Sequence, residues 1–219
     1  MPASRDGSER RALLQEARLY LIGDAAGLER ALDAALSAGA RIVQLRDKDL
    51  GDEALLDAAG RTAEACKAAG ALFVLNDRTD LAIEAGADGV HLGQDDAALT
   101  DARSIAGEDL LIGVSTHTPD QVDAAERSTA DYLGVGPVHE TPTKPGRPAV
   151  GLELVRHAAA STTKPFFAIG GVDAARAPAV IAAGARRLAV VRAICDAEDP
   201  AAAASALVAT IGVRDGAVV

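Results

Sequence analysis

Apolar residues in this chain gather in short unbroken runs, and several runs follow an alanine-rich stretch that closes on a glycine. The phrase Ala-Gly-Ala followed by an apolar run occurs at residues 38–45, 69–75, 85–92 and 183–190. A glycine that ends a helix can adopt the left-handed conformation, and an apolar run without polar alternation is typical of a strand buried on both faces. The repeat of about 20 to 30 residues is one helix–strand unit. The pattern therefore predicts parallel strands joined by helices.

Counting these units along the whole chain gives eight strands. They are expected near residues 18–22, 41–46, 72–76, 89–92, 110–115, 132–136, 165–169 and 187–191. Eight units favour an α/β fold of one (βα)8 TIM barrel, with parallel strands and an outer ring of helices. A doubly wound open sheet is the alternative, but residues 22–27 lack the G-x-G-x-x-G pattern of a dinucleotide-binding turn.

Alanine-rich stretches between the strands are expected to be helices. Two examples are residues 52–69 and 118–128, for which Asp52 and Thr118 are candidate N-caps. Alanine loses no side-chain entropy in a helix, which explains its abundance there. The 219 residues suit one barrel domain, which we expect at 13–219, after a polar and disordered tail at 1–12.

Charge and composition exclude several classes of partner. The formal net charge of −10 repels a polyanion, and no basic stripe with interleaved aromatic residues is present, so nucleic acid is not an expected partner. No apolar run approaches the roughly 18 residues needed to cross a bilayer, and the polar start does not resemble a signal peptide. Two cysteines, Cys66 and Cys195, are too few for a disulfide framework and favour a cytoplasmic protein. The sequence leaves a homo-oligomer open.

Clusters of polar residues follow several of the predicted strands. They lie at residues 44–48, 76–78, 94–96 and 141–144. Because the carboxyl ends of all strands of a barrel open on one face, these clusters are expected to meet there. Positive charge gathered in an acidic chain indicates a local purpose.

Asp77 and Asp96 end the third and fourth predicted strands. Neighbouring strands lie about 4.8 Å apart, so both carboxylates can reach one cation. Magnesium takes one or two carboxylates together with waters and substrate phosphate, which makes Mg²⁺ the expected cofactor. The alternative is that each aspartate only caps a helix.

Arg46, Lys48 and Lys144 are the cations expected at this opening. An arginine can hold a phosphate with two hydrogen bonds and a lysine adds a mobile charge, so with magnesium they could neutralise a diphosphate. The long loop at 137–150 is interpreted as a lid or a phosphate clamp. For the charged cluster at 46–48, the alternative is a solvated loop without a ligand.

Three further segments complete the candidate site. They are a glycine-containing strand end, an apolar strand end and a Ser-Thr-His sequence. The ends at 169–173 and 190–194 follow the seventh and eighth strands, where barrels commonly bind phosphate. Ser115 precedes His117 by two residues, but no G-x-S-x-G elbow surrounds them, which favours binding over covalent catalysis. His91 is interpreted as a histidine that supports the site from within the barrel.

With these clusters in place, the chain resembles the thiamine phosphate synthase family. The resemblance covers residues 19–199 and rests on Gln-Leu-Arg-Asp-Lys at 44–48, Leu-Asn-Asp-Arg at 75–78, His-Leu-Gly-Gln-Asp-Asp at 91–96, Gly-Val-Ser-Thr-His at 113–117, Thr-Pro-Thr-Lys at 141–144 and Ala-Ile-Gly-Gly-Val at 168–172. It implies a barrel enzyme that joins a pyrimidine methyl diphosphate to a thiazole phosphate and releases pyrophosphate.

The resemblance also implies a role for individual residues. The pyrimidine diphosphate would be held by Gln44, Arg46, Lys48, Asn76, Ser115 and Lys144, with Asp77 and Asp96 on its magnesium. The thiazole phosphate would be received by Thr141, Thr143, Gly171 and the backbone around Val191 and Arg192. Many members of the family carry Ser where this chain has Arg192, whose side chain could strengthen phosphate binding or point away. Catalysis would be carried by Arg46, Lys48, Lys144 and Ser115.

Two other functions are open from the sequence. The first is a tautomerase acting on the thiazole phosphate, which would need a base such as His117 and would leave the two aspartates unused. The second is a non-catalytic sensor of a heterocyclic phosphate.

Overall fold

The computed structural model describes residues 5–141 and 148–212. Eight strands form its core: β1 (Leu19–Gly23), β2 (Ile42–Leu45), β3 (Leu72–Asn76), β4 (Gly89–Leu92), β5 (Leu111–Thr116), β6 (Tyr132–Val135), β7 (Phe166–Ile169) and β8 (Leu188–Val190). Each strand pairs in parallel with its neighbours in chain order, and β8 closes on β1. The predicted TIM barrel is confirmed, and an open doubly wound sheet is wrong.

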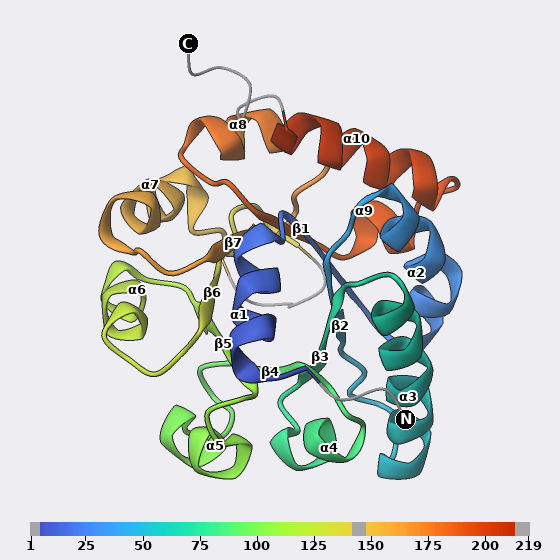
Figure 1. The fold of residues 1–219 in the computed structure, drawn as a ribbon. Helices are drawn as coiled ribbons and strands as arrows, with labels where there is room; N and C mark the ends of the chain where they lie inside the picture. The colour runs from blue at the N-terminus through green and yellow to red at the C-terminus, as the bar shows by residue number, and fades with distance from the viewer. Residues whose placement is uncertain (1–4, 142–147, 213–219) are drawn as a thin grey trace.

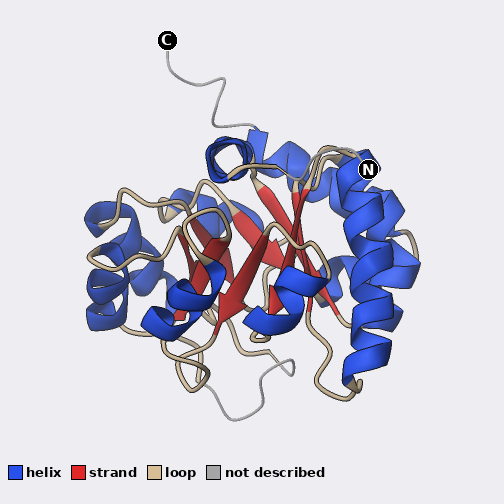
Figure 2. Cartoon of the chain, turned by 60° about the horizontal axis from the view of Figure 1, so that its bottom comes forward, coloured by secondary structure: helices blue, strands red, loops and turns tan. Residues whose placement is uncertain are grey.

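Helices surround this barrel (Figure 1). They are α1 (Gly7–Glu16), α2 (Ala25–Ala38), α3 (Asp52–Ala68), α4 (Thr79–Glu84), α5 (Leu99–Ala106), α6 (Pro119–Glu126), α7 (Gly151–Ser161), α8 (Ala177–Ala182), α9 (Arg192–Cys195) and α10 (Pro200–Gly212). Figure 2 shows the strands inclined across the centre of the molecule with helices outside them. The chain thus alternates strand and helix from β1 to β8, as the repeat predicted, and α9 and α10 follow β8 in succession.

Apolar residues form two separate cores on the two sides of the barrel wall. The outer core fills the space between strands and helices and is rich in alanine, which lets the helices pack closely. The inner core lies inside the barrel and includes Tyr20, Tyr132 and Phe167. Burial on both faces accounts for the unbroken apolar runs in the sequence.

Local sequence signals explain several of the helix ends. Gly39 ends α2 with φ of 115°, a conformation that the Ala-Gly-Ala phrase predicted. Thr118 caps α6 as predicted, because its hydroxyl accepts a hydrogen bond from the backbone N–H of Gln121. The predicted N-cap Asp52 is wrong: Gly51 holds that position, and the Asp52 carboxylate pairs with Arg78 instead.

The amino-terminal segment departs from the expected disorder at 1–12. From Gly7 onward it forms α1, which Asp6 and Glu9 start with a reciprocal capping box. The side chain of Leu14 joins the inner core and is 1% exposed. Figure 1 shows α1 crossing one end of the barrel. A polar helix is ordered here because its buried positions and ion pairs face the barrel, which the sequence of the segment alone does not show.

Candidate active site

The carboxyl ends of the strands surround a cavity of about 350 Å³. Four residues predicted for the pyrimidine diphosphate line it: Gln44, Arg46, Asn76 and Ser115. Four predicted for the thiazole phosphate line it as well: Thr141, Gly171, Val191 and Arg192. The volume is within the usual range for small-molecule sites, about 300 to 1,000 Å³. The parallel barrel therefore brings together residues that are far apart in the chain.

Two further predicted residues, Thr143 and Lys144, lie outside the described residues. The same holds for the central part of the predicted loop at 137–150. Both flanks of this loop are described, and the first flank contributes Pro137, Glu140 and Thr141 to the cavity lining.

The carboxyl groups of Asp77 and Asp96 lie side by side next to the cavity. The pKa of Asp77 is raised above its ordinary value, first because the group is partly buried and then because it interacts directly with Asp96. Lys48 acts in the opposite direction, with its Nζ 3.4 Å from Asp77 Oδ2. Within residues 5–141 and 148–212, no group of three or more acidic, histidine or cysteine side chains is arranged to hold a metal. The pair supplies two hard oxygen ligands, which fits the sparse protein coordination typical of Mg²⁺.

Backbone geometry aims both carboxylates at this point. Asp77 has φ of 62°, the left-handed region, and its backbone N–H still pairs with His91 on β4. Non-glycine residues in this conformation are uncommon and gather at functional sites. Asp96 is held by the backbone N–H of Gly93, which lies 2.8 Å from Asp96 Oδ2. Both aspartates are thus fixed by the turns that follow neighbouring strands.

The basic side chains of the polar clusters after β2 and β3 differ in the hydrogen bonds and ion pairs that they make. The Arg46 side chain makes no hydrogen bond or ion pair with any residue of the described chain, although it lines the cavity. Lys48 is 56% exposed and touches Asp77. Arg78 belongs to the same polar cluster in sequence but faces outward, where its guanidinium binds Asp52 and Asp80. Arg46 is therefore open to an anion in the cavity, while Lys48 is shared with Asp77.

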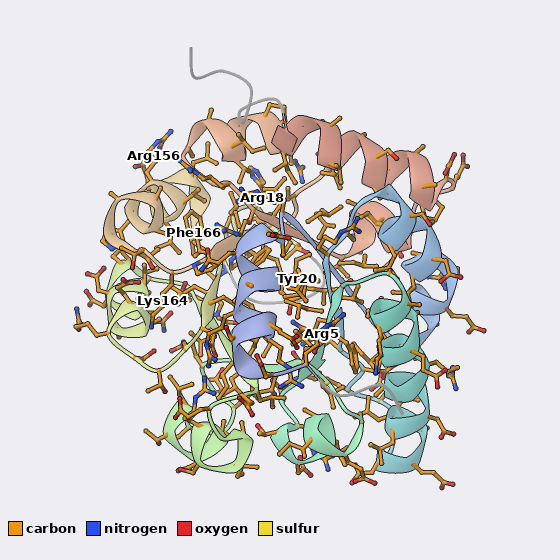
Figure 3. All side chains as sticks on the ribbon, viewed as in Figure 1. Arg5, Arg18, Tyr20, Arg156, Lys164 and Phe166 are labelled. Atoms are coloured by element: carbon orange, nitrogen blue, oxygen red, sulfur yellow. The ribbon has the colours of Figure 1, made fainter. Side chains whose placement is uncertain are left out.

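Aromatic residues form the floor of the cavity. The chain contains two tyrosines and three phenylalanines, and Tyr20, Tyr132 and Phe167 meet inside the barrel with ring centroids 5.1 to 6.0 Å apart. Figure 3 shows Tyr20 near the centre of the ring of strands. This floor was not predicted, although the sequence carries a usable signal for it, because the few aromatic residues concentrate on strands β1, β6 and β7.

The polar groups on this floor are linked by hydrogen bonds. His91 Nε2 lies 3.0 Å from Ser115 Oγ, and His91 Nδ1 lies 3.2 Å from the Tyr132 hydroxyl. This places His91 inside the barrel behind Ser115, the position expected of a supporting histidine. His117 is held separately, through a hydrogen bond between Nδ1 and the carbonyl oxygen of Gly136.

The ends of β6 and β7 form the opposite wall. The backbone N–H groups of Val138 and His139 bond the carbonyl oxygens of Ile169 and Gly170, so the loop after β6 lies directly on the end of β7. A Cβ atom on Gly171 would lie 2.8 Å from the Cβ of His139. Only glycine fits this approach, and Gly171 also has positive φ at 60°. The Gly-Gly signal in the sequence thus reflects close contact between two loops at the cavity.

Two arginines, Arg192 and Arg176, lie at this wall of the cavity. The Arg192 Nε lies 2.9 Å from Asp196 Oδ2, one helical turn away, and the side chain is 58% exposed. Arg176 was not predicted, yet it lines the cavity and donates to the carbonyl oxygen of Gly171. The Arg192 side chain is therefore paired at the surface, while Arg176 adds positive charge beside Gly171.

Across the described helices, none is both long and apolar enough to cross a bilayer.

Proteins similar to this chain carry names that are consistent with this site. The family model for thiamine monophosphate synthase matches residues 19–194. The chain is 51% identical over 201 residues to the thiamine-phosphate synthase of Gloeobacter violaceus, covering 91% of this chain and 59% of that longer relative. It is 50% identical to that of Acidothermus cellulolyticus, covering 92% of this chain and 98% of the relative.

A solved structure shares both the fold and the sequence. Thiamine phosphate pyrophosphorylase from Pyrococcus furiosus superposes with a TM-score of 0.83 at 31% identity, covering 92% of this chain and 98% of that one. The barrel, the residues around its cavity and these similarities agree, and the chain belongs to the thiamine monophosphate synthase family of transferases.

Proposed function

We propose that this protein condenses 4-amino-2-methyl-5-pyrimidinylmethyl diphosphate with 4-methyl-5-(2-phosphooxyethyl)thiazole to give thiamine phosphate and pyrophosphate. The observation that carries the proposal is the Asp77–Asp96 pair, with Lys48 on Asp77, directly after Asn76, which lines an aromatic-floored cavity together with Arg46. A flat heterocycle suits the floor, and a diphosphate suits the mouth. The relatives named above carry the same activity in their names.

The reaction we propose is dissociative. The bond between the pyrimidine methylene carbon and the diphosphate oxygen breaks with its electron pair leaving on oxygen, and the thiazole nitrogen then donates its lone pair to the methylene carbon. No proton enters or leaves in these steps. This explains why the cavity needs no dedicated general base, and why Ser115 and His91 can serve binding.

Arg46 and Lys48 would stabilise the negative charge that develops on the leaving diphosphate. Such groups act most strongly when they are fixed before the reaction, because no reorganisation is then needed as charge develops. A Mg²⁺ ion held by Asp77 and Asp96 would supply further neutralisation of the diphosphate charge. Gln44 and Asn76 line the cavity between this mouth and the floor and would orient the pyrimidine ring.

The thiazole phosphate would bind at the opposite wall. Gly171, Thr141 and the backbone around Val191 and Arg192 line this part of the cavity, and Arg176 adds a positive charge there. Thr143 and Lys144 stay predictions from the sequence, with Lys144 expected on the diphosphate. The two phosphate sites would then lie on opposite sides of the ring-binding floor, which is the arrangement that a two-substrate condensation needs.

The test is direct measurement of both products. Purified protein is given both substrates with Mg²⁺, and pyrophosphate and thiamine phosphate are quantified, with a chelator in parallel. We expect both products in equal amounts and loss of turnover with the chelator. Absence of both products from folded protein would overturn the proposed function, and turnover that a chelator leaves unchanged would overturn the part assigned to magnesium.

A further inference from the structure

A continuous chain of hydrogen bonds crosses the cavity floor. Gln44 Nε2 lies 2.5 Å from the Tyr20 hydroxyl, which lies 2.9 Å from the Tyr132 hydroxyl. The Tyr132 hydroxyl lies 3.2 Å from His91 Nδ1, and His91 Nε2 lies 3.0 Å from Ser115 Oγ. We call these five side chains the floor relay. Its two ends, Gln44 on β2 and Ser115 on β5, both line the cavity.

The interior of the floor relay is closed to water. Tyr20 and Tyr132 are 1% and 0% exposed, and Gln44 is 2% exposed. The pKa of each tyrosine is raised by burial, so both hydroxyls stay neutral throughout the range in which enzymes work. A buried hydroxyl hydrogen without an acceptor is costly, so each hydrogen must be given to a neighbour in the relay.

This requirement fixes the direction of every bond. Tyr20 accepts from the amide of Gln44, which has no lone pair to offer in return, so the Tyr20 hydrogen is donated to Tyr132. The Tyr132 hydrogen is then donated to His91 Nδ1, which must be unprotonated. His91 therefore carries its hydrogen on Nε2 and donates it to Ser115 Oγ.

The direction determines what each end offers to the cavity. The Gln44 amide nitrogen is occupied by Tyr20, and no described residue donates to the Gln44 carbonyl oxygen, which is left to accept from a ligand. Ser115 Oγ accepts from His91 and keeps its own hydrogen to donate. Rotating the Gln44 amide by 180° would reverse all these roles, since Tyr20 would then have to donate to Gln44.

Packing holds the relay in place. The Phe167 ring contacts both tyrosine rings edge to face, with centroids 5.1 Å from Tyr20 and 5.8 Å from Tyr132. The tyrosine hydroxyls therefore cannot swing away to find other partners. Reversal of Gln44 would have to move the hydrogens of the four other relay side chains with it.

From this geometry we infer that Tyr20, Tyr132 and His91 are positioning residues that lock Gln44 as a hydrogen-bond acceptor and Ser115 as a donor. The inference rests on the proposed function: the locked acceptor selects a pyrimidine that carries an amino group over one that carries an oxo group at the same position. A site built for a donor rejects an acceptor because two acceptors would then face each other without a hydrogen.

The first test needs no turnover. In protein labelled with ¹⁵N-histidine, NMR shifts report which nitrogen of His91 is protonated, with the His91 signals assigned by their absence in His91→Gln. We expect neutral His91 with the hydrogen on Nε2, and a mixture of tautomers in Tyr132→Phe, which removes the donor to Nδ1. Protonation at Nδ1 in the original protein would overturn the inference.

The second test is selectivity between the amino substrate and its oxo counterpart, measured as the ratio of kcat/KM values. Tyr20→Phe and Tyr132→Phe keep the aromatic packing and remove one relay hydroxyl each. We expect each to lower this ratio by about fivefold, which corresponds to the roughly 1 kcal/mol that one neutral hydrogen bond contributes. The double variant should lose no more than the larger single loss, because both break one connected relay.

Phe73→Leu is the matched control, since it disturbs packing in the outer core, away from the cavity lining and from every relay side chain. It should change the rates with both substrates equally. Ratios that stay within about twofold of the original in both tyrosine variants, or losses that simply add, would overturn the inference. If the original protein turns over neither substrate, the proposed function fails, while the His91 tautomer still decides the relay.

Discussion

The two ends of the barrel treat buried charge in opposite ways. At the amino end, Asp88 accepts from two arginines, Arg5 and Arg10, and from the backbone N–H of Phe73 on β3. At the carboxyl end, Asp77 meets another carboxylate, Asp96, and one lysine. The first arrangement is electrostatically complete and the second is not.

At the amino end, a second aspartate is also paired with two arginines and a backbone N–H group. Asp131 binds Arg11 and Arg103 and accepts from the backbone N–H of Ile112 on β5. Two of these arginines, Arg10 and Arg11, come from α1, so the helix that closes the barrel is fastened by charge as well as by Leu14. Charge at the amino end thus links distant parts of the fold, and we propose that charge at the carboxyl end is kept for a ligand.

Removing a charge from the carboxyl end should give the largest loss of activity. Asp77→Asn takes away one of the two proposed magnesium ligands, and Arg46→Gln takes away one stabilising cation. Each should lower kcat/KM by about 10² to 10³-fold, as the loss of one preorganised electrostatic group does. Pyrophosphate release measures this.

Asp80→Asn is the control for those variants, because Asp80 lies close in sequence to Asp77 but pairs with Arg78 on the surface. It should keep nearly full activity. Equal losses in Asp77→Asn and Asp80→Asn would break the distinction between a ligand-binding carboxylate and a surface one.

Removing a charge from the amino end should instead reduce stability. Asp88→Asn leaves Arg10, whose side chain is 10% exposed, with a neutral partner, and breaking such a buried pair costs about 3 to 5 kcal/mol. Urea unfolding should show this loss in the free energy of unfolding. Activity per folded molecule should stay unchanged, and a loss of activity without a loss of stability would contradict the comparison.

The pKa shifts of Asp77 and Asp80 predict that removing their charges will change the stability of the fold in opposite directions. A carboxyl group whose pKa is raised in the folded state costs stability as the pH rises through its titration, so at pH 7 Asp77 is destabilising on balance. Asp77→Asn should therefore raise the melting temperature in the absence of metal, by up to a few degrees, since about 1 kcal/mol corresponds to about 2 to 4 °C in a protein of this size.

The gain in Asp77→Asn should shrink as the pH falls below about 4 and be nearly gone at about pH 3, where the aspartate is largely protonated in both states. Asp80→Asn should give the opposite and smaller effect, because its hydrogen bonds to Arg78 lower the pKa of Asp80 and stabilise the fold at neutral pH. Differential scanning calorimetry between pH 3 and pH 8 tests both signs. A lower melting temperature for metal-free Asp77→Asn at pH 7 would contradict the account.

The smallest effect is expected at Arg192. Its side chain is paired with Asp196 on an exposed helical turn, and such a pair contributes about 0.5 kcal/mol or less. Arg192→Ser should therefore change the KM for the thiazole phosphate by less than about threefold. A tenfold rise in KM would show that the Arg192 guanidinium leaves Asp196 to bind the phosphate.

The sequence was most informative where local rules decide the outcome. The strand positions and the closed barrel followed from repeated apolar runs, and the gathering of Gln44, Arg46 and Asn76 followed from parallel topology, which places the carboxyl ends of all strands on one face. The order of α1 was missed because its partners, Asp88 and Asp131, are distant in sequence.

The cavity floor was missed for a related reason. Tyr20 and Tyr132 read as ordinary apolar strand residues, and only the closed barrel brings their hydroxyls together with His91. Likewise, nothing in the sequence separates Arg78, which faces outward, from Arg46, which faces the cavity. Side-chain direction at the end of a strand depends on the following turn, and the left-handed conformation of Asp77 shows that this turn is irregular.

The most direct test of the central claim is binding of a divalent ion at the acid pair. Mn²⁺ can stand in for Mg²⁺ and is counted by electron paramagnetic resonance, with pyrophosphate present. We expect one tightly bound ion in the original protein and its loss in both Asp77→Asn and Asp96→Asn, with Asp80→Asn unchanged. Undiminished binding in both variants of the acid pair would contradict it.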